Sequence, residues 1–210
     1  MKSLKNFINE GFKLGKNKVS KTTEHKYFPK NIDELREILY ERLEEDKNAD
    51  LNDIDVSKID NMSNLFKRFD PHDIDISEWD VSNVKNINEI FRDCKNFKGE
   101  GLENWNVRNV RQMVMSFEGC KNLNCDLSKW DVSKVEDMAY MFDACEKFNS
   151  DLSKWNVSKV KYMQGMFNNC KQFEGKGLEN WDITNVEDMR WMFGGCKSME
   201  NTPSWYLNRY

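Results

Sequence analysis

Residues 130–145 read Trp-Asp-Val-Ser-Lys-Val-Glu-Asp-Met-Ala-Tyr-Met-Phe-Asp-Ala-Cys, and this stretch decides the fold because it recurs along the chain. Its tryptophan returns in steps of 25 or 26 residues, at Trp79, Trp105, Trp130, Trp155 and Trp181. A weaker copy begins at Ile54, and a last fragment begins at Trp205. A period of this size is typical of a solenoid, in which each repeat is one coil that buries its apolar face against its neighbours.

The spacing of apolar residues within one repeat predicts two kinds of local structure. Leu127, Trp130 and Val132 follow the spacing of a leucine-rich repeat, whose last two apolar residues point inward from a short strand. From Val84 to Phe91 the spacing changes to three and four, which favours a short helical segment. The predicted fold class is therefore an α/β solenoid: a leucine-rich-repeat-like right-handed coil with short parallel strands, short helical segments and an N-terminal capping helix.

The chain is expected to have three regions. Residues 1–30 form a basic N-terminal arm, residues 31–50 contain the capping helix, and residues 51–210 form the repeat solenoid, with six coils and a terminal half-coil. The helix is indicated by apolar residues at helical spacing, at Ile32, Leu35, Ile38, Leu39 and Leu43. A second apolar pattern in the arm predicts either a docking segment or a frayed tail, and it consists of Leu4, Phe7, Ile8, Phe12 and Leu14.

The charge distribution limits the classes of partner that the chain is expected to bind. The net charge is −4, but residues 1–30 hold eight lysines and two acids, which leaves a net charge of −10 on residues 31–210. An acidic solenoid is not expected to bind nucleic acid by itself. No stretch has the length and composition of a membrane span or of a signal peptide, so synthesis in the cytoplasm is expected, with the final location left open.

The cysteines, tryptophans and methionines are best interpreted as structural. Five cysteines share one position of the repeat, which predicts a row of reduced, packed thiols; intercoil disulfides would need an oxidising location. The tryptophans have the inward parity of core residues, although a sugar-stacking platform is the alternative. No cofactor or metal site is predicted, because the cysteines lack zinc spacing and the chain has two histidines. No nucleophile–base pair or phosphate loop stands out, so the chain is not expected to be an enzyme.

A polar stripe is the predicted partner-binding surface. Residues next to the inward tryptophans should face outward and line a concave surface. They are Glu78, Asp80, Asn104, Asn106, Arg108, Lys129, Asp131, Lys154, Asn156, Asn180 and Asp182. The competing interpretation is that the regular Asp and Ser residues only satisfy backbone amides in turns.

The run Trp130-Asp131-Val132-Ser133-x-Val135-x-x-Met138-x-x-Met141-Phe142-x-x-Cys145 closely resembles the BspA-like leucine-rich-repeat surface-protein family, and the resemblance covers residues 54–199. The resemblance implies a repeat domain of unknown function, in a family of bacterial surface proteins and lipoproteins implicated in adhesion, with related arrays in viruses and tailed phages. The first ten residues are weakly similar to leaders of gut-phage proteins.

Two functions are therefore predicted. The first is a non-catalytic protein–protein interaction or structural scaffold module, such as a phage virion-associated component attached through its N-terminal segment. The alternative is a bacterial surface adhesin that binds host protein or glycan. The sequence does not identify the protein partner.

Overall fold

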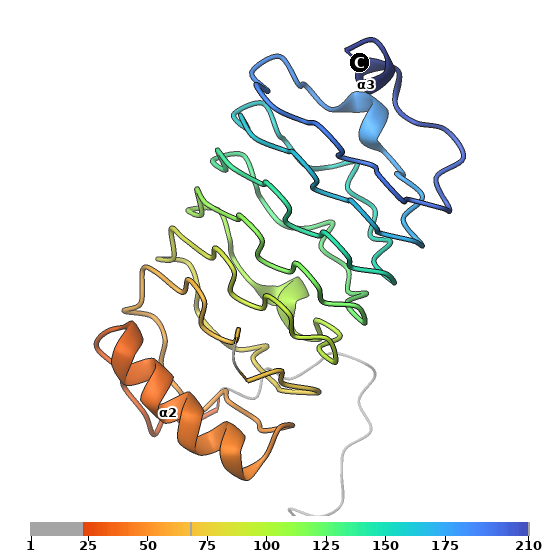
Figure 1. Ribbon diagram of the computed structural model, residues 1–210. Helices are drawn as coiled ribbons and strands as arrows, with labels where there is room; N and C mark the ends of the chain where they lie inside the picture. The colour runs from red at the N-terminus through yellow and green to blue at the C-terminus, as the bar shows by residue number, and fades with distance from the viewer. Residues whose placement is uncertain (1–22, 68, 210) are drawn as a thin grey trace, which may run out of the picture.

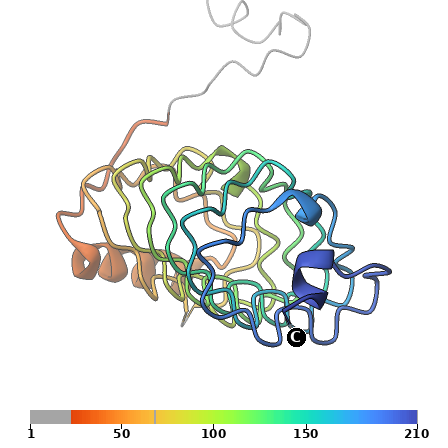
Figure 2. The same cartoon turned by 90° about the horizontal axis from the view of Figure 1, so that it is seen from above.

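The computed structural model describes residues 23–67 and 69–209. Figure 1 shows a row of windings that begins beside the helix α2 (Ile32–Glu45) and ends at the short helix α3 (Ser204–Leu207). From above, the windings are nested loops of similar outline (Figure 2). Two single 3-10 turns complete the helical elements, η1 (Leu102–Asn104) and η2 (Leu178–Asn180). We name each winding after its tryptophan, or after Ile54 in the first, and count positions from that residue.

Backbone amides hold each winding to the next. At positions +8, +10, +12 and +14 the amide of one winding donates to a carbonyl of the following winding. In the Trp130 winding these donors are Met138, Tyr140, Phe142 and Ala144, with N···O distances of 2.8–2.9 Å. The same four positions donate in the Trp79, Trp105 and Trp155 windings. The backbone hydrogen bonds at these four positions therefore all donate towards the C-terminal end of the row.

The predicted α/β solenoid is wrong with respect to its strands. No strand or sheet forms within residues 23–67 and 69–209, and parallel pairing is limited to isolated bridges. The strands were expected at the tryptophan and at the valine two residues later. There, however, the amides close tight turns: the amide of Ser133 donates to Asp131 Oδ1 (3.1 Å), and that of Val135 donates to the carbonyl of Val132 (2.9 Å). The longest row of bridges instead lies at position +7, through Asn61, Asn86, Gln112, Asp137, Tyr162 and Asp188.

The predicted helical segment in each coil is wrong as well. Val84–Phe91 contains no helix, because Glu89 has φ +55° and its amide donates to Val114 of the next winding. A left-handed residue interrupts a right-handed helix. The helices α2 and α3 lie at the two ends of the row, and α2 falls within the region 31–50 where the capping helix was expected.

Short polar side chains take the place of regular secondary structure. Asx turns, in which an Asp or Asn side chain accepts from the amide two residues later, recur at positions −4, +1 and +7 of the windings. In the Trp130 winding the three acceptors are Asp126, Asp131 and Asp137, at 2.9–3.1 Å. These turns bend the chain into its closed outline without strands.

The core is made of stacked rows of identical residues. Phe142 stacks on Phe117 (ring centroids 5.6 Å apart) and on Phe167 (5.7 Å), and all three rings are fully buried. The indole of Trp155 is 3% exposed, and its Nε1 donates to the carbonyl of Leu127 one winding earlier (3.0 Å). The other repeat tryptophans and Trp205 donate in the same way, at 2.8–3.2 Å. The tryptophans are thus core residues whose one polar atom is satisfied.

Both ends of the row are covered. The helix α2 begins at Asn31, whose side chain accepts from the amides of Asp33 and Glu34, and it buries Leu35, Leu39 and Leu43. Its Arg42 pairs with Asp53 (2.9 Å), which binds the helix to the Ile54 winding. At the other end, Tyr206 of α3 meets the ring of Phe193 edge-on, with centroids 5.1 Å apart. The apolar rows are therefore closed at both ends.

Candidate partner-binding face

The predicted polar stripe is exposed along its whole length, but many of its side chains have structural roles. All eleven residues are exposed. The side chains of Asp80, Asp131, Asn156 and Asp182 each accept from the amide two residues later. Lys129 and Lys154 belong to the variable part of the stripe and are exposed. The turn-forming interpretation thus accounts for the regular part of the stripe.

The predicted docking segment falls outside the described part of the chain. Leu4, Phe7, Ile8, Phe12 and Leu14 belong to residues 1–22, so the docking interpretation stays a prediction.

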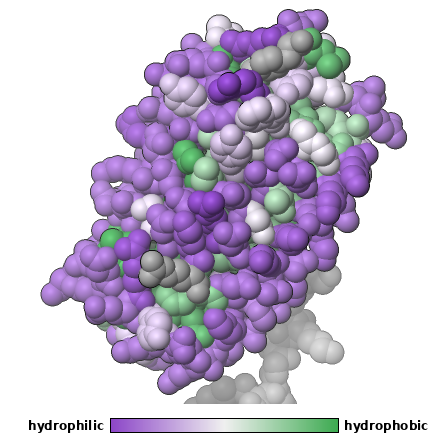
Figure 3. Space-filling model, in the orientation of Figure 1, coloured by the Kyte–Doolittle hydropathy of each residue, from purple (hydrophilic) through white to green (hydrophobic). Residues whose placement is uncertain are grey.

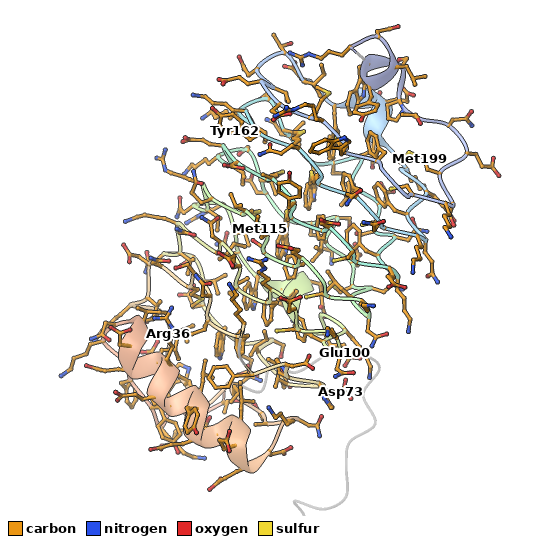
Figure 4. All side chains as sticks on the ribbon, in the orientation of Figure 1. Arg36, Asp73, Glu100, Met115, Tyr162 and Met199 are labelled. Carbon is orange, nitrogen blue, oxygen red and sulfur yellow. The ribbon has the colours of Figure 1, made fainter. Side chains whose placement is uncertain are left out.

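A different surface combines polar and apolar groups in a way the core does not require. It consists of positions +7, +9 and +10 of the tryptophan windings, and we name it the ladder face because it carries the longest row of bridges. Its residues are Asn86, Asn88, Glu89, Gln112, Val114, Met115, Asp137, Ala139, Tyr140, Tyr162, Gln164, Gly165, Asp188, Arg190 and Trp191. Figure 4 labels Met115 and Tyr162 on the same side of the molecule, and Figure 3 shows that side as hydrophilic with scattered hydrophobic patches.

Large apolar side chains are exposed on the ladder face. Trp191 is 67% exposed and Tyr162 is 36% exposed, whereas the repeat tryptophans are buried. The Tyr162 hydroxyl donates to Glu187 (3.0 Å), and Arg190 lies over the Trp191 ring (5.9 Å to the centroid) while pairing with Asp188 (2.7 Å). Hydrogen-bonded and cation-stacked aromatic rings present fixed apolar surfaces to solvent.

Position +10 of the ladder face has an unusual backbone conformation. Met115, Tyr140 and Trp191 have φ of +54°, +55° and +58°, in the left-handed region that favours glycine. Gly165 occupies this position in the Trp155 winding with φ +60°, and a Cβ there would lie 2.4 Å from the ring of Tyr140, which covers the glycine. Three windings nevertheless carry a bulky residue, at a backbone cost of about 1–2 kcal/mol each. The exposed ring of Trp191 gains little packing in return for this cost, which suggests a functional role for that side chain.

Charged groups are partly buried at the edge of the face. Nε of Arg92 lies 3.1 Å from Oε2 of Glu118, without the geometry of a hydrogen bond. Burial raises the pKa of Glu118 in spite of this neighbour. Hydrogen bonds from Lys67 and Arg92 lower the pKa of Glu89. No group of three or more His, Cys, Asp or Glu side chains that could hold a metal occurs in residues 23–67 and 69–209.

The thiols are poor nucleophiles in the folded protein. Cys94, Cys120, Cys145 and Cys170 are buried, and the five column cysteines donate from Sγ to phenylalanine carbonyls one winding earlier. Burial raises the pKa of Cys125 to about 12 and that of Cys196 to about 11. All six are free thiols in the structure. Near neutral pH the two partly exposed thiols are therefore protonated.

A hollow at the other end of the molecule is a second candidate surface. It lies between α2 and the Ile54 winding, with a volume of about 670 Å³, and its lining includes Arg36, Tyr40, Leu65, Lys67 and Phe69. Tyr40 is 60% exposed and meets Phe69 edge-on at 6.4 Å. It is a local site, whereas the ladder face extends over five windings.

Asp137 tests whether a residue of the ladder face lowers the free energy of unfolding. Burial raises the pKa of this carboxyl group, and no cation pairs with it within the described residues. Asn86 holds the same turn at the same position two windings earlier. We therefore expect Asp137→Asn to raise the free energy of unfolding at pH 7, on the order of 1 kcal/mol.

The pH dependence of this gain has a defined sign. The raised pKa means that the charged carboxylate disfavours the folded state at pH values above the folded-state pKa, and this penalty disappears below the ordinary aspartate range. The gain should therefore vanish as pH falls towards 3, measured by urea unfolding at each pH. A loss of stability at pH 7 would contradict this interpretation, and Asp188→Asn is the matched control because Asp188 pairs with Arg190.

Comparison with known families identifies the family of this chain. Residues 33–113 and 88–206 match the family described as "Mycoplasma protein of unknown function, DUF285". The chain belongs to this family. DUF285 includes BspA-like repeat proteins, which agrees with the resemblance at this coarse level, and its description assigns no activity. No curated protein and no solved structure matches the chain. In the described part of this DUF285 chain, no helix has the length and hydropathy needed to cross a membrane.

Proposed function

We propose that this DUF285 chain is a non-catalytic protein-binding module that uses the ladder face. The observation that carries the proposal is the exposed ring of Trp191, held in a left-handed conformation at position +10, on the same face as the exposed Tyr162. Trp191 is the most exposed large apolar residue of the described chain.

The composition of the face fits a protein partner. Tyrosine, tryptophan, methionine and arginine are enriched in protein interfaces, and Tyr162, Trp191, Met115 and Arg190 lie on this one face. These groups are spread over several windings, which favours an extended protein surface over a small ligand.

The decisive test removes the exposed rings. We expect Tyr162→Ala combined with Trp191→Ala to lower the amount of any specifically captured partner at least tenfold in quantitative cross-linking pull-downs from the source cells, since an interface aromatic residue typically contributes about 2 kcal/mol or more. Lys129→Ala combined with Lys154→Ala is the matched control, because both lysines are exposed on the predicted polar stripe.

The outcome shows whether the partner binds to the ladder face or to the polar stripe. Loss of capture in the lysine variant with retention in the aromatic variant would move the site to the polar stripe and refute the ladder face. Both variants should keep the unfolding midpoint of the parent, which excludes misfolding as the cause. The adhesin alternative predicts binding on a glycan array that disappears in the lysine variant. Attachment to a virion through residues 1–22 stays a prediction.

A further inference from the structure

The amide row that joins the windings has an open end. In the four windings before the last, the amides at +8, +10, +12 and +14 each donate to the following winding. In the Trp181 winding these amides belong to Met189, Trp191, Phe193 and Gly195, and none has an acceptor within residues 23–67 and 69–209. Trp191 and Gly195 are exposed, Phe193 is half-buried and Met189 is buried, so the row reaches the surface over residues 191–195. An unpaired row of backbone donors favours binding of a complementary chain.

This edge offers donors only. Every carbonyl from residue 188 to 194 already accepts a hydrogen bond: those of residues 188, 190, 192 and 194 accept from the Trp155 winding, and those of 189, 191 and 193 accept from within the same winding. The edge of an ordinary strand would offer donors and acceptors in alternation. A second copy of this edge cannot pair with it, because donors would meet donors.

The two ends of the molecule differ in whether side chains bond to their exposed backbone groups. At the first winding, side chains donate to backbone carbonyls: Arg36 Nη2 of α2 donates to Ser63 (2.8 Å), and Lys47 Nζ, two residues after α2, donates to Phe69 (2.6 Å). Figure 4 shows Arg36 on α2 at that end. A second copy therefore cannot offer a free first winding. At the last winding, Trp205 and Tyr206 of α3 contact the ring of Phe193.

We propose that residues 189–195 bind an extended segment of a partner protein by backbone addition. The segment would run parallel to this stretch and present carbonyls at alternate residues, as residues 188, 190, 192 and 194 do for the Trp155 winding. Turning those carbonyls to one side requires left-handed residues, as at Trp191 and Gly195 (φ +58° and +73°), so the partner segment adopts left-handed conformations four residues apart, which glycine and asparagine favour. The proposal does not depend on the ladder face, because it uses backbone amides and not exposed side chains.

The test follows the four amides directly. The probe is the acetylated and amidated peptide Asn-Val-Glu-Asp-Met-Arg-Trp-Met-Phe-Gly-Gly, the sequence of residues 185–195, added to the full chain. In amide hydrogen exchange resolved by NMR, Met189, Trp191, Phe193 and Gly195 should exchange faster than Met163, Gly165, Phe167 and Asn169 in the free protein. Saturating peptide should slow the first group at least tenfold and leave the second unchanged.

Three controls make the result decisive. A scrambled peptide should give no protection; equal protection would overturn the proposed register. A peptide of alternating glutamate and serine should also fail; if it alone protects the amides, the site takes carboxylates and the proposal is wrong. Trp191→Gly, which copies Gly165 of the preceding winding, should keep the protection because the amide remains. Loss in that variant would assign binding to the indole ring, and slow exchange without peptide would show that the row is already paired.

Discussion

Replacing Phe142 by alanine is expected to lower the free energy of unfolding by about 3–5 kcal/mol, because a fully buried phenylalanine leaves a cavity. The ring is sandwiched between Phe117 and Phe167 and also stacks on Phe148, with centroids 4.1 Å apart. Neighbours on both sides hold the site open, so it cannot collapse. Urea unfolding followed by tryptophan fluorescence measures the change.

Phe193→Ala is the matched control. Phe193 stands in the same column at the last winding and is only half-buried. We expect it to cost about 1–2 kcal/mol, since the removed surface is partly in water already. Equal losses at the two positions would mean that the central stack is no more tightly packed than its end. The slope of the urea transition should be compared as well, because repeat arrays can lose two-state behaviour.

Gly177→Ala is expected to have the second-largest effect, a loss of about 3 kcal/mol. Gly177 precedes η2 with φ +83°, a conformation that costs an L-residue about 1–2 kcal/mol. A Cβ at this position would also lie 2.5 Å from Cα and 2.8 Å from the backbone nitrogen of Ser153. Relieving that overlap requires movement of backbone, which adds about 1–3 kcal/mol.

Gly101→Ala separates the two contributions. Gly101 has the same place before η1 and φ +92°, but its Cβ would meet the backbone of Ser77 at 3.1 Å. We expect a loss of about 1–2 kcal/mol, mainly from the backbone conformation. If thermal and urea unfolding show the larger loss at Gly101, close approach between windings is not what restricts Gly177.

The repeat could be predicted from the sequence because each core position carries the same or a similar residue in successive windings. The 25-residue period, the inward tryptophans and the helix beginning near Ile32 follow from apolar spacing. The strands and helical segments could not be predicted correctly. Their assignment depends on the backbone at position +10, where Glu89, Met115 and Tyr140 adopt a left-handed conformation that their residue types do not signal. Spacings of three and four then imitate a helix.

The candidate site was missed for a related reason. Residues assigned to a helical segment were interpreted as core, so the exposed part of that segment was not considered for binding. One signal was available: position +10 contains Glu89, Met115, Tyr140, Gly165 and Trp191, while the neighbouring core columns hardly vary. The polar stripe was the predicted binding surface instead, although its regular aspartates match the Asx-turn pattern.

The hydrogen bonds between windings lie along the row, and this orientation has a mechanical consequence. Bonds that lie along the row are loaded one after another when the two ends are pulled apart, so they open singly and resist little force. Each released winding would lengthen the tether by 25 or 26 residues, about 85 Å of extended chain. Under tension the molecule would therefore behave as a stepwise extensible tether.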